Sequence, residues 1–306
     1  MKWLTFLSDY GFEDAFLGVC KGVIARTAPE VRVLDVLHLV VPQDVDQGAA
    51  VLASAVPYLP SPAVHLALVD PFRATPVPGI AVRTADGSVF VSPDNGLTSM
   101  AWAACGGPVE ARLLDNRDLW NPAPARTFRG RDVFSPVAAR LADGLDFSQV
   151  GTPVDVDEVE RIEARTPTVE ADHVHGEVVQ VDHFGNLTLN LERSHLEQAG
   201  IALGDDVELR CSGKALVVPF LETYGQVGRG RLVVCEDSFR TVTLAVNQGN
   251  AAQRLRAGRG EPLVISRLHA PLVPGPLVLP PEPNVIAIVR SRSDALPGAV
   301  RSYDET

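Results

Sequence analysis

Two aspartates of this chain directly follow runs of apolar residues. Asp9 follows residues 2–8 (KWLTFLS), and Asp70 follows residues 63–69 (AVHLALV). Open α/β sheets bind ligands at the carboxyl ends of their strands, so both carboxylates are expected on that edge. There they could accept hydrogen bonds from ribose hydroxyls or hold a cationic ligand. Each could equally cap the following helix or turn a loop.

Three further segments carry groups that can recognise a small molecule. Residues 182–186 (DHFGN) offer an aromatic face and an amide, although Gly-Asn is also simple turn chemistry. Residues 247–252 (NQGNAA) are small enough for a backbone to approach a planar ligand such as adenine, or they start a helix. Residues 127–132 (TFRGRD) combine two arginines with an acid, which is typical of an anion pocket or of a surface ion pair.

Other chemical motifs are missing from the sequence. It has no G-x-G-x-x-G opening the first helix, no phosphate-binding G-x-x-x-x-G-K loop and no G-x-S-x-G elbow. His173 and His175 lie one residue apart, but no carboxylate accompanies them at the spacing of a known metal motif. We interpret the two histidines as solvent-facing residues of a linker and predict no metal site.

Alternating strands and helices are expected in the first half of the chain. We predict strands over residues 2–8, 31–36 and 63–69, and helices over residues 14–27 and 43–55. This alternation favours βαβ units and a mostly parallel central sheet. Shorter strands are expected around an Asp86-Gly87 turn, at residues 80–83 and 89–91. Further helices are expected at residues 95–104 and 136–141.

The pattern changes after residue 163, where short β-rich runs follow one another between turns. These runs are residues 176–181, 187–191, 206–211, 215–218, 231–235, 241–246 and 262–266. Such spacing predicts a small antiparallel sandwich or barrel. Residues 164–173 read as a linker, and an apolar strand is expected at residues 284–289. We therefore predict an N-terminal α/β domain (1–165), a C-terminal β-barrel-like domain (172–270) and a proline-rich extension (271–306).

Composition limits the class of partner. Of the 306 residues, 27 are Lys or Arg and 38 are Asp or Glu, which gives a net charge of −11. Nucleic-acid binding needs clustered positive charge, so we expect no nucleic-acid partner. The first apolar run ends at Asp9, too early for a signal peptide, and no run has the length of a membrane span. We expect a cytoplasmic protein whose four dispersed cysteines are reduced thiols.

Taken together and in this order, the motifs resemble those of the S-adenosyl-L-methionine hydroxide adenosyltransferase family, which is related to the bacterial fluorinase and chlorinase. The resemblance covers nearly the whole chain apart from the tail. The matching motifs are Ser8-Asp9-Tyr10-Gly11 with Asp14, Val69-Asp70-Pro71, Pro93-Asp94-Asn95-Gly96-Leu97, Thr127-Phe128 with Gly130-Arg131-Asp132, residues 182–186, and Ala245-Val246-Asn247 with Gly249-Asn250-Ala251-Ala252.

The resemblance implies a homotrimer that binds S-adenosyl-L-methionine, without a cofactor, between the N-terminal domain of one subunit and the C-terminal domain of the next. By matching position, Asp9 would hold the ribose hydroxyls. Asp182 and Asn186 would contact the methionine portion, and Phe184 would line that pocket. The other substrate-binding residues that the motifs imply are Asp14, Asn95, Ser238, Asn250 and Ala251, with Ser238 near the methionine and the last two near adenine.

The reaction that the resemblance implies needs a well-placed nucleophile more than an acid. The sulfonium is already a good leaving group, so a water, hydroxide or halide must be held in line with C5′ and stripped of bulk solvent. The water-using members of the family place an aspartate, an arginine and a histidine around it. Asp70 resembles the aspartate of the water users.

The chain departs from this trio at two positions. The family's arginine falls near Pro76-Val77, and Arg129 stands at the histidine's position. A guanidinium stays protonated in proteins and cannot act as a base. Three functions remain open. The first is a hydrolase giving adenosine and L-methionine, in which Asp70 orients water and Arg73 or Arg129 stabilises hydroxide. The second is a nucleoside-binding protein with weakened or lost catalysis, and the third is an adenosyltransferase that uses a halide or another anion.

Overall fold

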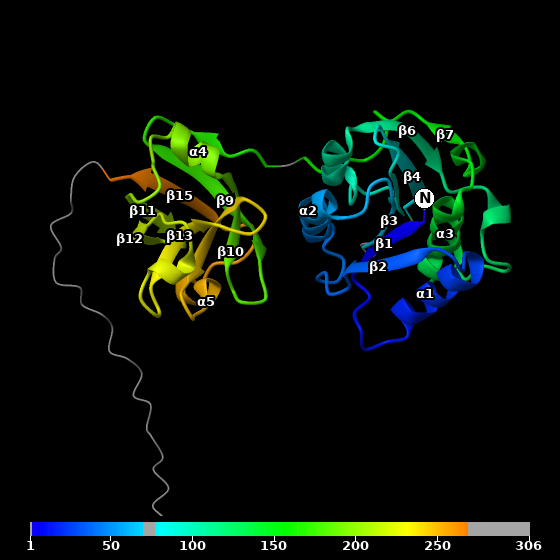
Figure 1. Ribbon diagram of the computed structural model, residues 1–306, viewed down its shortest axis with the longest axis horizontal. Coiled ribbons are helices and arrows are strands. Elements are labelled where there is room, and N and C mark those ends of the chain that lie inside the picture. Colours follow the sequence, from blue (N-terminus) through cyan, green and yellow to red (C-terminus); the bar gives the residue numbers. More distant parts are fainter. Residues whose placement is uncertain (1, 70–76, 164, 269–306) are drawn as a thin grey trace, which may run out of the picture. The chain divides into compact units, whose positions relative to one another are not determined.

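A computed structural model describes residues 2–69, 77–163 and 165–268, which form two β-sheets (Figure 1). The first sheet has the strand order β2-β1-β3-β5-β4-β6-β7. Its strands are β1 (Trp3–Ser8), β2 (Arg32–Leu37), β3 (Val64–Leu68), β4 (Gly79–Thr84), β5 (Val89–Pro93), β6 (Pro108–Leu113) and β7 (Pro153–Val154). The strands predicted around residues 2–8, 31–36 and 63–69 are confirmed.

Only half of the first sheet consists of parallel strands. Strands β2, β1, β3 and β5 pair in parallel, whereas β4, β6 and β7 continue the sheet with antiparallel pairs. The antiparallel half begins at the predicted hairpin, where Asp86 accepts bonds from Thr84 Oγ1 (2.8 Å) and Ser88 N (2.9 Å) and Gly87 has φ +88°. The α/β class is confirmed, and the hairpin explains why the sheet is partly rather than mostly parallel.

Helices cover both faces of this sheet (Figure 1). On one face, α1 (Phe16–Thr27) and α3 (Ser135–Asp143) pack against side chains such as Leu4 and Phe6 of β1. On the other, α2 (Val45–Ala55) and the 3₁₀ helix η2 (Ser99–Cys105) share a core with Leu7. The short segments η1 (Val56–Tyr58), η3 (Arg117–Leu119) and η5 (Phe147–Gln149) are 3₁₀ turns, and η4 (Gly130–Phe134) is a π-helical turn.

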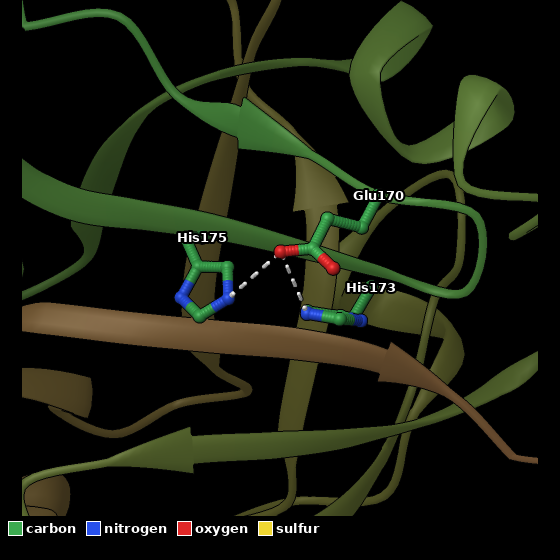
Figure 2. Close-up of side chains that lie close together, drawn as sticks. All are labelled: Glu170, His173 and His175. Carbon is green, nitrogen blue, oxygen red and sulfur yellow. Dashed lines mark ion pairs between the residues drawn. The ribbon is translucent and has the colours of Figure 1, made fainter.

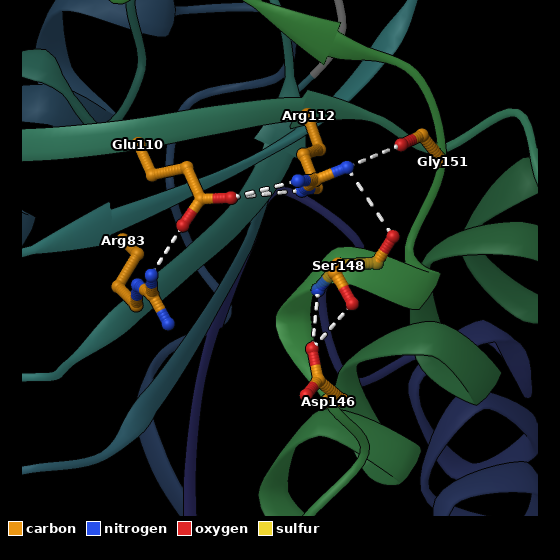
Figure 3. A network of polar contacts seen from close by, with 6 residues as sticks. All are labelled: Arg83, Glu110, Arg112, Asp146, Ser148 and Gly151. Carbon is orange, nitrogen blue, oxygen red and sulfur yellow. Dashed lines mark hydrogen bonds and ion pairs between the residues drawn. The ribbon is translucent and has the colours of Figure 1, made fainter.

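The strands β6 and β7, which form the antiparallel edge of the sheet, were not predicted from the sequence. A polar network holds this edge in place (Figure 3). Glu110 on β6 pairs with Arg83 of β4 and with Arg112, the latter at 2.9 Å. Arg112 also donates to the carbonyls of Ser148 (3.2 Å) and Gly151 (3.0 Å). The network therefore fastens the chain that follows α3 to the antiparallel edge of the sheet.

The second sheet is antiparallel throughout and has the order β12-β11-β15-β9-β10-β14-β13, with β8 paired to β9. One parallel bridge, between Phe220 and Val234, joins the chain after β12 to β13 and nearly closes a barrel, as predicted. Its strands are β8 (Thr168–Val169), β9 (His173–Val181), β10 (Leu187–Glu192), β11 (Asp206–Cys211), β12 (Lys214–Pro219), β13 (Leu232–Glu236), β14 (Thr241–Val246) and β15 (Pro262–Arg267).

The helical segments α4 (Arg193–Gln198), η6 (Tyr224–Gln226) and α5 (Ala251–Leu255) connect these strands. Two sequence interpretations need correction here. The stretch read as a linker contains β8, and His173 and His175 lie on β9 rather than in a linker. The sequence did not reveal β8 because a strand of two residues is too short for a periodic signal, and it is defined only by its pairing with β9.

All four cysteines are free and buried, as expected for dispersed thiols. Burial raises the pKa of Cys20, Cys105 and Cys235 to about 11. Within the part of the chain that the structure describes, no helix is long and apolar enough to cross a bilayer. The extension 271–306, including the strand predicted at residues 284–289, lies outside the described residues, as do Asp70 and Arg73.

Candidate active site

The carboxyl ends of β1, β3 and β5 meet at one edge of the first sheet. The register pairs Ser8 with Leu68 and Leu66 with Val91, so the parallel strands end side by side. Asp9 N donates to the Leu68 carbonyl at 3.3 Å. The Asn95 side-chain amide donates to the carbonyl of Val69 at 2.9 Å, which anchors the end of β3. The structure thus brings Asp9 and Asn95 to one edge, while Asp70 and Arg73 lie outside the described residues.

Asp9 does not cap the helix that follows it. The residue before α1 is Ala15, which makes no capping side-chain bond, and Asp9 Oδ2 instead accepts from Gln43 N at 2.9 Å. The carboxyl is half-buried, and burial raises its pKa even though the bond from Gln43 opposes the shift. A partly desolvated carboxylate with one oxygen committed to the backbone can accept further bonds with the other. Asp14 lies in the exposed turn before α1.

A chain of polar side chains, which the sequence did not predict, runs from buried Ser8 and His38 next to this carboxylate to Asp35 and Lys21 at the surface. Ser8 Oγ is 2.7 Å from His38 Nδ1, and His38 Nε2 is 3.1 Å from Asp35 Oδ1. Lys21 Nζ completes the chain at 2.8 Å from Asp35 Oδ2. Burial lowers the pKa of His38, against the opposing effect of Asp35, so the imidazole is neutral near pH 7.

With neutral His38, the hydrogen-bond pattern assigns the tautomer. Nε2–H donates to Asp35, and Nδ1 accepts from the Ser8 hydroxyl. The Ser8 oxygen in turn accepts from Tyr10 N at 3.3 Å, so the chain holds the turn that carries Asp9. Ser8 and His38 are both 0% exposed, which excludes Ser8 as a nucleophile toward an external substrate in this conformation. These residues are positioning groups.

The arginine-containing segment 127–132, which runs into η4, packs directly against the Asp9 turn. A Cβ added at Gly130 would overlap the Tyr10 hydroxyl, so this close approach requires glycine. Arg131 forms a two-point ion pair with Asp132, both contacts at 2.7 Å, and this pairing holds the pKa of the buried Asp132 at about 2. The ion-pair interpretation of Arg131 and Asp132 therefore applies, rather than an anion pocket.

Arg129 contacts the chain just before β4. Its Nη1 donates to the carbonyl of Val77, and its guanidinium lies over the Phe134 ring at 5.0 Å from the centroid. The guanidinium thus reaches the stretch in which the family's arginine was expected. It supplies a fixed positive charge beside Val77, just before β4, and cannot accept a proton there.

In the barrel, two of the predicted motifs are in direct contact. The Asn250 side chain packs on Gly185, where a Cβ would overlap it, and Ala252 N donates to the Gly185 carbonyl at 2.9 Å. Asn250 Oδ1 accepts from Gln253 N at 2.7 Å and so caps α5. Ala251 is buried. The sequence suggested a turn in the first motif and a helix start in the second, and both are present.

The loop 182–186 is shaped by its aspartate. Asp182 Oδ1 accepts from Phe184 N (2.9 Å) and Asn186 N (2.8 Å), while Oδ2 accepts from the Asn186 amide at 2.8 Å. This turn leaves Phe184 74% exposed. A large aromatic side chain held in water by a rigid turn is available for a ligand or a partner.

The turn that carries Ser238 has the same construction. Asp237 Oδ1 accepts from Phe239 N (2.8 Å) and Thr241 N (3.1 Å), and Phe239 is 51% exposed. Asp237 Oδ2 is 3.4 Å from Thr188 Oγ1, which links the turn to β10, the strand that begins directly after residues 182–186. Ser238 itself is exposed.

Comparison with known proteins accounts for both sheets. Residues 4–151 match the model of the SAM hydroxide adenosyltransferase N-terminal domain, and residues 176–264 match that of the C-terminal domain. The chain belongs to the SAM hydroxide adenosyltransferase family. The family membership inferred from the motifs is therefore confirmed, and the matched segments contain the described candidate residues of both sheets.

Several relatives resemble this family member over most of their length. A protein of Salinispora tropica named (R)-S-adenosyl-L-methionine hydrolase is 44% identical over 86% of this chain and 97% of its own. A hydrolase of the same name from Thermus thermophilus is 37% identical, covering 86% and 99%. A fluorinase from Nocardia brasiliensis is 27% identical, covering 83% and 94%. The crystal structure of an uncharacterized conserved protein from Thermotoga maritima superposes with a TM-score of 0.81 at 35% identity, covering 86% of this chain and 100% of that one.

Proposed function

We propose that this protein hydrolyses S-adenosyl-L-methionine to adenosine and L-methionine. The observation that carries the proposal is the 44% identity, over 97% of its length, to a relative named (R)-S-adenosyl-L-methionine hydrolase. The relatives named fluorinase are more distant, at 28% identity or less. The water-using reaction is therefore favoured over the halide-using one.

In the proposed reaction, a water oxygen attacks C5′ of the substrate in line with the sulfonium. The C5′–O bond forms as the C5′–S bond breaks, and its electron pair leaves with sulfur, so methionine departs as a neutral thioether. The water gives up a proton, and adenosine keeps the new oxygen as its 5′-hydroxyl. Positioning and desolvation of the water supply most of the acceleration, because the leaving group needs no acid.

We assign the ribose to Asp9, whose position at the end of β1 and half-buried carboxylate suit two hydroxyl donors. The chain Lys21–Asp35–His38–Ser8 holds that turn in place. Asp70 is the proposed water-orienting residue. Arg129 or Arg73 would stabilise the developing hydroxide as a fixed cation, with Asn95 fastening the end of β3 just before Asp70.

The barrel loops complete the proposal on the side of methionine and adenine. The turn that Asp182 and Asn186 form would place Phe184 against the ligand, and Ser238 lies on a turn of the same kind. The backbone at Asn250 and Ala251 would meet adenine, and Asp14 would lie beside the ribose. As the family resemblance implies, we propose that a homotrimer brings the two sets of loops together from different subunits, in the cytoplasm.

The test is to incubate the purified protein with S-adenosyl-L-methionine and to quantify adenosine and methionine by chromatography. Equal amounts of both products above a blank without enzyme support the proposal. The absence of adenosine above this blank at every accessible pH would refute it. A 5′-halogenated adenosine that appears only with added halide would identify the anion-using reaction instead.

A second function, nucleoside binding with weakened catalysis, is favoured by one observation. Arg129 replaces the family's histidine and is committed to the Val77 carbonyl. Calorimetry with adenosine and S-adenosyl-L-methionine separates this case, because tight binding without turnover identifies it. The variant Arg129→His restores the family's residue type, and a gain of turnover in that variant alone would show that the substitution had silenced the reaction.

A further inference from the structure

The hairpin formed by β8 and β9 carries a cluster of carboxylate and imidazole side chains that the proposed reaction does not use. Thr168 pairs with His175 and Val169 with Val174, and Glu170 N donates to the His173 carbonyl at 2.8 Å across the turn. Side chains alternate between the faces of a strand. Val169 and Val174 therefore pack into the barrel core, while Glu170, His173 and His175 share the outer face.

These three side chains converge on the outer face of the hairpin (Figure 2). Glu170 Oε1 lies 3.5 Å from His173 Nε2 and 3.9 Å from His175 Nε2. One ligand atom from each residue lies within 4.8 Å of the other two. A tetrahedral ion with bonds of about 2.0–2.1 Å needs ligand atoms about 3.3–3.4 Å apart. Small side-chain rotations would therefore close this cluster around an ion.

A fourth side chain orients one of the imidazoles. His173 Nδ1 is 2.7 Å from Asp172 Oδ1, so that nitrogen donates to the carboxylate and Nε2 is left facing Glu170. Metal-binding histidines commonly hold their second ring nitrogen in this way, which fixes the tautomer and increases the basicity of the ligand.

We propose that Glu170, His173 and His175 bind one divalent transition-metal ion of the Zn²⁺ class. Two imidazole nitrogens and one carboxylate oxygen are a ligand set that suits Zn²⁺, Co²⁺ and Ni²⁺. The His175 side chain is 50% exposed, which leaves the fourth position to water. Bound metal would link the turn after β8 to β9 and stabilise this hairpin.

The experiment is calorimetric titration of the full chain, free of any affinity tag, with ZnCl₂ at about pH 8. This pH lies above the usual imidazole pKa of about 6.5 and allows for the increase that Asp172 causes in the pKa of His173. We expect one Zn²⁺ per chain. Co²⁺ in place of Zn²⁺ should give the visible absorption of a four-coordinate site.

Variants decide whether these residues are the ligands. His173→Ala and His175→Ala are expected to abolish the binding event, and Asp172→Asn to weaken it about 10- to 100-fold. Glu177→Gln is the matched control: it removes a carboxylate from the same strand, one that pairs instead with Arg165 at 2.7 Å, and should leave Zn²⁺ binding unchanged. Circular dichroism checks that each variant is folded. Failure of the wild-type chain to bind Zn²⁺ would overturn the proposal, as would full binding by a folded His175→Ala variant.

Discussion

Gly185→Ala tests the contact between the two barrel motifs. Gly185 has φ +83°, and its added Cβ would overlap the side-chain amide of Asn250. A left-handed backbone costs an alanine about 1–2 kcal/mol relative to glycine. Asn250 must also rotate away and release Gln253 N, and a lost helix cap costs about 0.5–2 kcal/mol. We therefore expect Gly185→Ala to lower the free energy of unfolding by about 1.5–4 kcal/mol.

A double-mutant cycle separates these two contributions. Asn250→Ala alone should cost only the cap, about 0.5–2 kcal/mol. In the double variant the cap is already absent, so the Gly185→Ala substitution adds only its backbone cost. The sum of the two single losses in unfolding free energy should then exceed the loss in the double variant by the free energy of one helix cap.

The assay must report on the barrel. The three tryptophans are residues 3, 102 and 120, so their fluorescence follows the first sheet only. Urea unfolding followed by circular dichroism, with hydrogen exchange at the Ala252 amide that donates to Gly185, measures the relevant stability. Strict additivity of the two substitutions would refute the steric coupling.

Three further predictions test the first sheet. Asp9→Asn should leave the unliganded protein at least as stable near pH 7, because burial raises the pKa of this carboxyl and so disfavours its charged form. Each charge-assisted ribose bond lost should weaken adenosine binding by about 1.5–3 kcal/mol, roughly 10- to 150-fold. An unchanged calorimetric Kd for adenosine would contradict the assignment of the ribose to Asp9. Gly130→Ala should cost about 1–3 kcal/mol in urea unfolding followed by tryptophan fluorescence, because its Cβ overlaps the Tyr10 hydroxyl, and Tyr10→Phe should recover part of this loss. A Tyr10→Phe background that leaves the cost unchanged would rule out that overlap. His65 is 1% exposed, and burial lowers its pKa to about 4, whereas the unfolded chain binds the proton near pH 6.5. The contribution of neutral His65 to the unfolding free energy is therefore intact above about pH 6.5 and falls by up to about 3 kcal/mol as the pH drops toward 4. The unfolding free energy of the wild type should then decline more steeply with falling pH than that of His65→Gln. Equal dependence of the two unfolding free energies on pH would contradict this.

Regular elements with a strong hydrophobic period were predictable from the sequence. The strand before Asp9, the helix ending at Thr27 and the Asp86-Gly87 hairpin lie where the pattern indicated. Strand β6 was missed because its residues Pro108–Leu113 mix charges with apolar side chains, and β8 because it has only two residues. Their positions follow from pairing with neighbouring strands, which a local pattern does not contain.

The candidate site was predictable at its motifs but not in its supporting contacts. Asp9 and Asn95 follow β1 and β5, the two parallel strands on either side of β3, and lie at the same edge of the sheet. The chain from Ser8 through His38 to Asp35 depends on the register between β1 and β2, which no single motif reveals. A signal was present in the polar residues Asp35 and His38 within an otherwise apolar stretch. Likewise, the partnership of Glu170 with two histidines required knowledge that the segment was a hairpin.

The origin of the oxygen in the product tests the proposed hydrolysis most directly. The protein is incubated with S-adenosyl-L-methionine in water enriched in ¹⁸O, and the adenosine formed is analysed by mass spectrometry. Attack of water at C5′ predicts one ¹⁸O atom per adenosine, located in the 5′-hydroxyl, together with one methionine that carries no label. Adenosine without the label, or no adenosine beyond that of a blank without enzyme, would contradict the proposal.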